Sequence, residues 1–82
     1  MVKRGYFRGA SFSVNGNKNT TIVTSAYLAN SHWAAHVSLY VDDVEVKQKD
    51  FGLFADLADA LVAAIKVGSQ LANDGNTGWA GL

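Results

Sequence analysis

The clearest feature of the sequence is a regular alternation of apolar and polar residues from Trp33 to Val41. Successive side chains of a β-strand point to opposite faces, so this alternation predicts a strand with one buried face. The apolar set, which defines that face, is Trp33, Ala35, Val37, Leu39 and Val41. Clusters of turn-forming residues divide the N-terminal part of the chain into four predicted strands, at residues 5–14, 20–28, 33–41 and 44–51.

The lengths of the three intervening loops fix which residues of neighbouring strands face each other. These loops are predicted at residues 15–19, 29–32 and 42–43. The predicted cross-strand pairs are Val14 with Thr20, Phe12 with Ile22, Leu28 with Trp33, Ile22 with Leu39, Leu39 with Val46, and Val41 with Val44. All three loops then place apolar residues on one face of an antiparallel meander. That face consists of Phe12, Val14, Ile22, Leu28, Trp33, Val37, Leu39, Val41, Val44 and Val46.

The period of the apolar residues changes after Gly52. Helical spacing from Leu53 to Ala72 predicts a helix of about 20 residues, and Asn73-Asp74-Gly75 predicts its end. The stripe expected to cover the sheet is Phe54, Leu57, Leu61, Ile65, Gly68 and Ala72. The predicted fold class is therefore α+β, a four-stranded antiparallel meander followed by one long C-terminal helix packed on one sheet face (ββββα). We expect a single domain over residues 1–75 and a Gly-rich tail over residues 76–82.

Small and apolar residues cover most of the circumference of the predicted helix. A helix that covers one sheet needs an apolar stripe only a little over 100° wide. The surplus predicts a homo-oligomer in which Val62, Val67 and Leu71 meet a second chain. The alternative is a monomer with an alanine-rich helix, because exposed alanine costs little.

Composition excludes several classes of protein. The chain has 82 residues, no Cys and no Pro, which leaves no room for a multi-domain enzyme, a disulfide framework or a thiolate zinc site. The pair His32 and His36 has helical metal-ligand spacing but falls on a loop and a strand, and no catalytic motif is present. We therefore expect a non-enzymatic cytoplasmic protein with no cofactor, no bound metal and no membrane span.

The formal net charge of zero conceals an uneven distribution. Residues 1–41 carry four basic and no acidic side chains, whereas residues 42–82 carry three basic and seven acidic ones. Such asymmetry marks a binding face in some proteins. The alternative is that the two halves of the chain attract each other and so favour folding.

The predicted register also defines the sheet face turned away from the helix, which is aromatic, small and cationic. Bases of single-stranded nucleic acid stack on aromatic rings, and cations bind the phosphates. The predicted stacking residues are Phe7, Tyr27, Tyr40 and Phe51. The predicted phosphate-binding residues are Arg4, Arg8, Lys47 and Lys49, with His36 assisting. The alternatives for the aromatic residues are cross-strand pairs that stabilise the sheet, or a protein-binding patch.

One stretch resembles a known family. The motif Trp33-Ala34-Ala35-His36-Val37, then Lys47-Gln48-Lys49-Asp50-Phe51-Gly52-Leu53-Phe54, then Leu57 with Ala58, Ala60, Ala63 and Ala64, resembles the core of AP2-type DNA-binding domains and of the arm-binding domains of phage integrases. The resemblance covers residues 33–66 and implies a sheet that docks on DNA. The order of elements is also similar to Whirly single-strand binders and to small phage inhibitors, including some anti-CRISPR proteins.

Three functions follow from these patterns together with the resemblance, which alone implies the phage or mobile-element type. The first is a small nucleic-acid-binding protein of phage or mobile-element type, with single-stranded nucleic acid on the face away from the helix. The second is a protein–protein inhibitor, such as an anti-CRISPR or other phage accessory protein, which uses the same face or the acidic turn at Asp42, Asp43 and Glu45. The third is a structural or assembly subunit, which the apolar helix favours.

Overall fold

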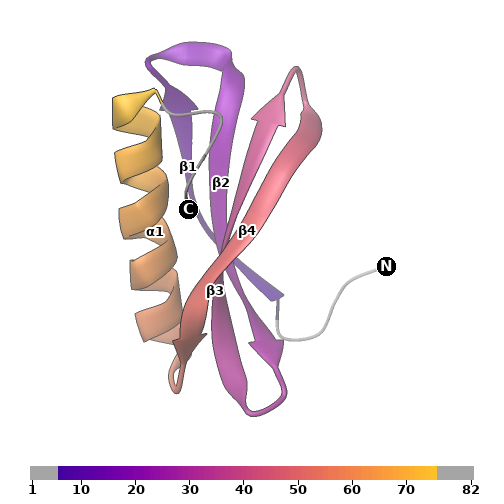
Figure 1. The fold of residues 1–82 in the computed structure, drawn as a ribbon, viewed down its shortest axis with the longest axis vertical. Coiled ribbons are helices and arrows are strands. Elements are labelled where there is room, and N and C mark those ends of the chain that lie inside the picture. The colour runs from indigo at the N-terminus through magenta and orange to yellow at the C-terminus, as the bar shows by residue number, and fades with distance from the viewer. Residues whose placement is uncertain (1–5, 76–82) are drawn as a thin grey trace.

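Four antiparallel strands form one sheet in chain order, and a single helix packs on one side of it (Figure 1). The elements are β1 (Tyr6–Val14), β2 (Asn17–Ala29), β3 (His32–Val41), β4 (Val44–Phe54) and α1 (Leu57–Asp74). This computed structural model describes residues 6–75, so Arg4 and the predicted tail lie outside the described residues. The predicted α+β fold, a meander followed by a C-terminal helix, is confirmed.

The central pair of strands has the predicted register. Leu28 pairs with Trp33, and Ile22 pairs with Leu39. The pairing continues to Ala29 and His32, so the connecting turn is shorter than predicted. The apolar alternation of both strands is strong, and a slip of one residue would move every buried side chain to the other face.

Both outer hairpins turn on two residues with positive φ. Asp42 and Asp43 have φ values of 51° and 67°, and Val41 pairs with Val44 as predicted. The turn between β1 and β2 is Asn15-Gly16, at 51° and 75°, rather than the predicted five-residue loop. Two consecutive positive φ values match the twist of antiparallel strands, and Asn-Gly and Asp-rich pairs tolerate them.

The predicted pair of Val14 with Thr20 is wrong, because Val14 pairs with Asn17. Residues 18–20 form an irregularity before the regular pairing of Ser13 with Thr21 resumes. The side chain of Asn17 stabilises it, since its Oδ1 accepts a hydrogen bond of 2.9 Å from the Asn19 N–H.

A bulge in β4 changes the register of that strand. Tyr40 pairs with Glu45, but the next pair is Leu39 with Lys47, which leaves Val46 as an extra residue. The predicted pair of Leu39 with Val46 is therefore wrong. A second irregularity lies at Gly52, whose φ is 102°. An extra residue reverses the in–out alternation of everything beyond it.

A second bulge, in β1, is stabilised by a side chain of β2. Gly9 and Ala10 together lie opposite Thr24. The Oγ1 of Thr24 accepts a hydrogen bond of 2.8 Å from the Ala10 N–H and donates one of 2.9 Å to the Ala10 carbonyl. The bulge interrupts the hydrogen bonds between β1 and β2 at Ala10. The buried Thr24 hydroxyl therefore takes the place of the missing backbone partners of the Ala10 N–H and carbonyl.

Helix α1 begins at Leu57 rather than at the predicted Leu53, because β4 continues to Phe54. Gly75, at φ 66°, ends it where the sequence predicts. The helix packs most closely on β2 and β1 and least on β4 (Figure 1). Its contact line is a row of small buried residues, Ala60, Ala64 and Gly68, which permits a close approach to the sheet.

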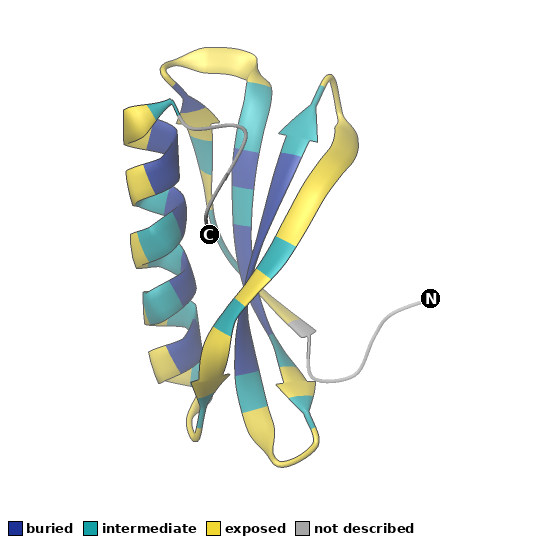
Figure 2. Ribbon diagram, viewed as in Figure 1, coloured by how far each residue is buried: buried dark blue, intermediate teal, exposed yellow. Residues whose placement is uncertain are grey.

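The core lies between α1 and the sheet (Figure 2). It contains Val14, Ile22, Ala35, Val37, Leu39, Ala64, Leu71 and Ala72. Three residues of the predicted buried face are exposed instead, namely Leu28, Val44 and Val46, at 49%, 61% and 54%. Val44 and Val46 are exposed because they lie on β4, the strand that α1 covers least.

The predicted oligomer interface is largely used within the chain. Leu71 is buried in the core at 5% exposure, and Val67 packs against the core. Only Val62 of the three predicted residues is exposed, at 62%. The apolar excess of the helix is therefore absorbed by the sheet, and the homo-oligomer stays a prediction. Among the described residues, no helix combines the length and apolarity that crossing a membrane requires.

Candidate functional site

The face of the sheet opposite α1, called the open face below, differs from the predicted one on β4. Because Val46 is an extra residue, Lys47 pairs with Leu39 and Lys49 pairs with Val37. Leu39 and Val37 belong to the core, so both lysines lie on the helix side of the sheet. The placement of Lys47, Lys49 and Phe51 on the open face is therefore wrong. The open face of β4 instead carries Glu45, Gln48, Asp50 and Leu53, opposite Tyr40, Ser38, His36 and Ala34.

Lys47, Lys49 and Phe51 lie on the helix side of β4 instead of the open face. Phe51 packs against the core, and the Lys49 Nζ lies 5.9 Å from the centroid of the Phe51 ring. Phe51, Lys47 and Lys49 are thus separated by the sheet from Arg8, Tyr27, His36 and Tyr40, the predicted site residues that stay on the open face.

The bulge in β1 likewise changes which residues of that strand lie on the open face. Phe7 pairs with Ala26, and its ring packs edge-on against Trp33, with centroids 5.6 Å apart. Its placement on the open face is therefore wrong. Arg8 pairs with Ser25 and takes the open-face position predicted for Gly9. A Cβ on Gly9 would lie 2.6 Å from the Thr24 Oγ1, so glycine is required where the bulge meets that side chain.

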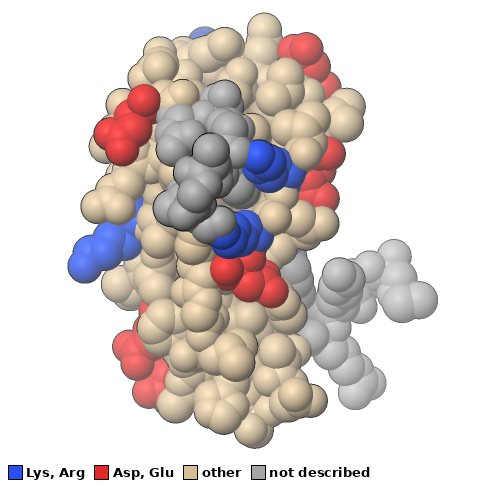
Figure 3. All heavy atoms as spheres, in the orientation of Figure 1, with Lys and Arg blue, Asp and Glu red and all other residues tan. Residues whose placement is uncertain are grey.

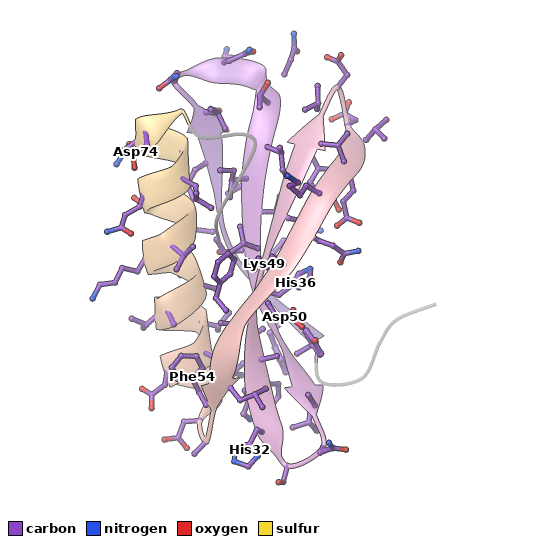
Figure 4. The ribbon with its side chains drawn as sticks, in the orientation of Figure 1. His32, His36, Lys49, Asp50, Phe54 and Asp74 are labelled. Atoms are coloured by element: carbon purple, nitrogen blue, oxygen red, sulfur yellow. The ribbon has the colours of Figure 1, made fainter. Side chains whose placement is uncertain are left out.

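Four side chains of the open face form a hydrogen-bond network, shown in part in Figure 4. His36 Nδ1 lies 2.7 Å from Asp50 Oδ1, and Ser38 Oγ lies 3.1 Å from His36 Nε2. Tyr27 donates its hydroxyl to Asp50 Oδ2 at 2.5 Å, and its ring stands edge-on to the imidazole. A carboxylate only accepts, so Nδ1 of His36 carries a proton, and Nε2 of a neutral ring accepts from Ser38. The network joins β2, β3 and β4.

The order Ser38–His36–Asp50 is that of an acyl-transfer triad, but the surroundings are unsuited to that chemistry. Ser38 is 3% exposed, which denies a substrate access to its Oγ. Strand β3 is paired on both sides, so its amides are used in the sheet and are not free to bind an oxyanion. This geometry indicates a network that holds three strands in register. The expectation of a non-enzymatic protein stays a prediction.

Replacing Asp50 with alanine is expected to lower the free energy of unfolding by about 1–2 kcal/mol, because the buried His36 loses the partner of its Nδ1–H. Glu45→Ala removes another exposed carboxylate from the same strand and is expected to change stability by less than about 0.5 kcal/mol. Urea unfolding of both variants measures the difference. Equal losses in the two variants would show that the network does not stabilise the sheet.

A hollow of about 260 Å³ lies beside this network on the open face. The residues that line it come from β1, β2, β3 and the turn between β3 and β4: Arg8, Asn19, Thr21, Val23, Tyr40 and Asp43. It brings together two predicted site residues, Arg8 and Tyr40, from strands that are not neighbours. Two others, Tyr27 and His36, meet in the network.

The described residues contain no group of acidic, His and Cys side chains that could hold a metal ion. His32 lies at the turn between β2 and β3, whereas His36 lies in the middle of the sheet (Figure 4). The spacing of these two histidines therefore carries no site. On the surface seen in Figure 3, basic side chains alternate with acidic ones and form no continuous basic patch.

Sequence reasoning did not single out Asn19, Thr21, Ser38 or Asp50 as site residues. The sequence does contain a signal for the face of Asp50. Phe51 and Phe54 both pack against the core, but residues three apart in a regular strand point to opposite faces, so an irregularity must lie between them. With Phe51 facing the helix, its neighbour Asp50 faces the other side. Comparison with known proteins finds no family model, no curated sequence and no solved structure that matches the chain significantly. The resemblance to AP2-type domains stays a prediction.

Proposed function

We propose that this protein binds single-stranded nucleic acid on its open face, with the hollow as the central subsite. The observation that supports this is that Arg8 and Tyr40 line the same hollow. The hydroxyl-bearing Thr21 and the amide-bearing Asn19 line it as well. An aromatic ring for a base, a guanidinium for a phosphate and short polar groups for a base edge are the parts that such a site needs. Duplex DNA presents no free base to such a hollow.

The charge of the open face determines how this binding responds to salt. Arg8 is the cation that lines the hollow, while Lys47 and Lys49 lie on the other face of β4. Each phosphate contact on a single strand contributes about −0.7 to the slope of log K against log salt concentration. Raising the salt from about 50 to about 200 mM is therefore expected to weaken binding only about threefold.

Fluorescence anisotropy with a labelled single strand of about ten nucleotides tests the proposal. Tyr40→Ala is expected to weaken binding roughly 5- to 150-fold through the loss of one stacked base. Arg8→Gln is expected to weaken binding and to make the salt slope shallower by about 0.7. The matched control is the double variant Lys47→Gln/Lys49→Gln, which removes charge from the other face and is expected to leave the salt slope unchanged.

Two results would overturn the proposal. One is the absence of binding by the wild-type protein at about 50 mM salt, where electrostatic binding is strong. The other is a loss of affinity in the Lys47→Gln/Lys49→Gln variant together with normal binding by Tyr40→Ala and Arg8→Gln. The second result would place the nucleic acid on the helix side of β4. Circular dichroism of each variant confirms that it is folded.

A protein partner is the second candidate, and exposed apolar side chains favour it. Phe7 is 46% exposed and Leu53 is 63% exposed. Val44 and Val46 are exposed beside Asp42 and Asp43 at the acidic turn. Exposed apolar residues among acidic ones suit a basic protein surface. An inhibitor of the phage type would use this turn, and a variant with Val44→Ser and Val46→Ser would then lose its partner while retaining any binding of nucleic acid.

A further inference from the structure

The two charged residues of the hollow lie at opposite ends of it. Asp43 belongs to the turn between β3 and β4, next to Asn19, whose carbonyl accepts a hydrogen bond of 2.8 Å from the Asp42 N–H. Arg8 lies several residues further along the sheet, opposite Ser25. The hollow therefore has an anionic end and a cationic end.

The middle of the hollow suits one flat ring system. Tyr40 and Thr21 face each other across β3 and β2, and Val23 provides an apolar surface beyond them. A volume of about 260 Å³ lies below the range of about 300–1,000 Å³ that is usual for drug-sized ligands. One base that stacks on Tyr40 is thus the natural occupant, with its edge towards one end and its phosphate towards the other.

The chemistry of the anionic end distinguishes the bases. A carboxylate such as that of Asp43 only accepts hydrogen bonds, and it binds most strongly to two adjacent donors. Guanine presents such a pair, N1–H and N2–H, on its Watson–Crick edge. Adenine and cytosine present one exocyclic donor beside an unprotonated ring nitrogen, and thymine and uracil present one N–H between two carbonyls. In each of these, a ring or carbonyl lone pair would face the carboxylate.

We propose that the hollow is a guanine-selective subsite for a nucleotide of the single strand, an inference that rests on the proposed function. The base stacks on Tyr40, and its N1–H and N2–H donate to the Asp43 carboxylate. The side-chain amide of Asn19 donates to O6, and Arg8 binds the phosphate. Asp43 and Asn19 therefore set the base preference, whereas Arg8 and Tyr40 contribute affinity for any base.

Four labelled oligothymidylates of about eight nucleotides test this, three with one central G, A or C and one without. The strand with G is expected to bind roughly 5- to 150-fold more tightly than the other three. Asp43→Asn is expected to abolish this preference, because an amide also donates and no longer discriminates. Asp42→Asn is the matched control, since Asp42 lies at the same turn with positive φ but does not line the hollow. It is expected to preserve the preference.

The outcomes separate this inference from the proposed function. Equal binding of all four strands would overturn the guanine subsite and leave the proposed function standing. Loss of the preference in Asp42→Asn as well as in Asp43→Asn would also overturn it, because a general acidic field would then be responsible. NMR-monitored titrations with GMP, AMP and CMP test the case in which the protein binds a free nucleotide but no oligonucleotide. GMP-specific shifts at Tyr40 and Asp43 without binding of any oligonucleotide would support the subsite and overturn the single-strand function.

Discussion

Replacing Gly68 with alanine is expected to lower the free energy of unfolding by about 2 kcal/mol, although alanine favours an isolated helix by about 1 kcal/mol. A Cβ at this position would lie 2.5 Å from the Thr24 Cγ2 and 3.3 Å from the Ile22 Cγ2. Both of those side chains are fully buried. Thr24 cannot rotate away, because its Oγ1 holds both backbone groups of Ala10. The helix must therefore move away from the sheet.

A second substitution tests this explanation. Thr24→Ser removes the Cγ2 methyl but keeps the hydroxyl, and it is expected to cost about 1 kcal/mol alone. In the double variant the new Cβ occupies the space of the lost methyl, so we expect a favourable coupling energy of about 1–2 kcal/mol. Chemical unfolding of the four proteins in the cycle measures it. Simple addition of the two losses would show that the close approach of α1 to β2 is not the cause.

Thr24→Val is expected to cost about 2–4 kcal/mol, because it replaces the hydroxyl with a methyl of similar size and leaves the N–H and carbonyl of Ala10 unpaired. The matched control is Thr21→Val, the same chemical change on the same strand at a half-buried position. It is expected to change stability by less than about 0.5 kcal/mol.

Hydrogen exchange provides a local readout of the Thr24→Val effect. The Ala10 amide is expected to exchange faster in Thr24→Val than in the wild type, because its acceptor is lost. Unchanged exchange at Ala10 together with normal stability would show that the bulge of β1 does not depend on the threonine. Thr24→Ser keeps both hydrogen bonds and is expected to leave the exchange of this amide slow.

The parts of the fold that sequence reasoning predicted correctly are those with a strong apolar period. The alternation around Val37 in β3 specifies one register with β2, and the helix ends at Gly75, which is suited to positive φ. The helical spacing of the sequence predicts a start that is too early. Leu53 and Phe54 fit a helical stripe, yet they lie at the end of β4, which continues past the irregularity at Gly52, a residue with positive φ.

The candidate site was predicted less well because the outer strands contain bulges. From Lys47 to Asp50 every residue is polar, so no apolar alternation indicates which of them face the helix. Val44 and Val46 are spaced as in a regular strand, so the sequence pattern gives no indication that Val46 is an extra residue. The strong alternation of β3 therefore predicts the sheet face of Tyr40 and His36 correctly, whereas the prediction for Lys47 and Lys49 gives the wrong face.

The irregular outer strands also affect how the protein behaves at high concentration. Strands β1 and β4 are the two edges of the described sheet, and an edge strand offers unpaired backbone groups to any other extended chain. Here the bulges at Gly9 and Val46 break the even spacing of those groups, and Lys47 and Lys49 add charge beside one of them. An incoming strand finds only short matching stretches on either side. The extra residues that reorganise the open face thus also protect the protein against edge-to-edge aggregation.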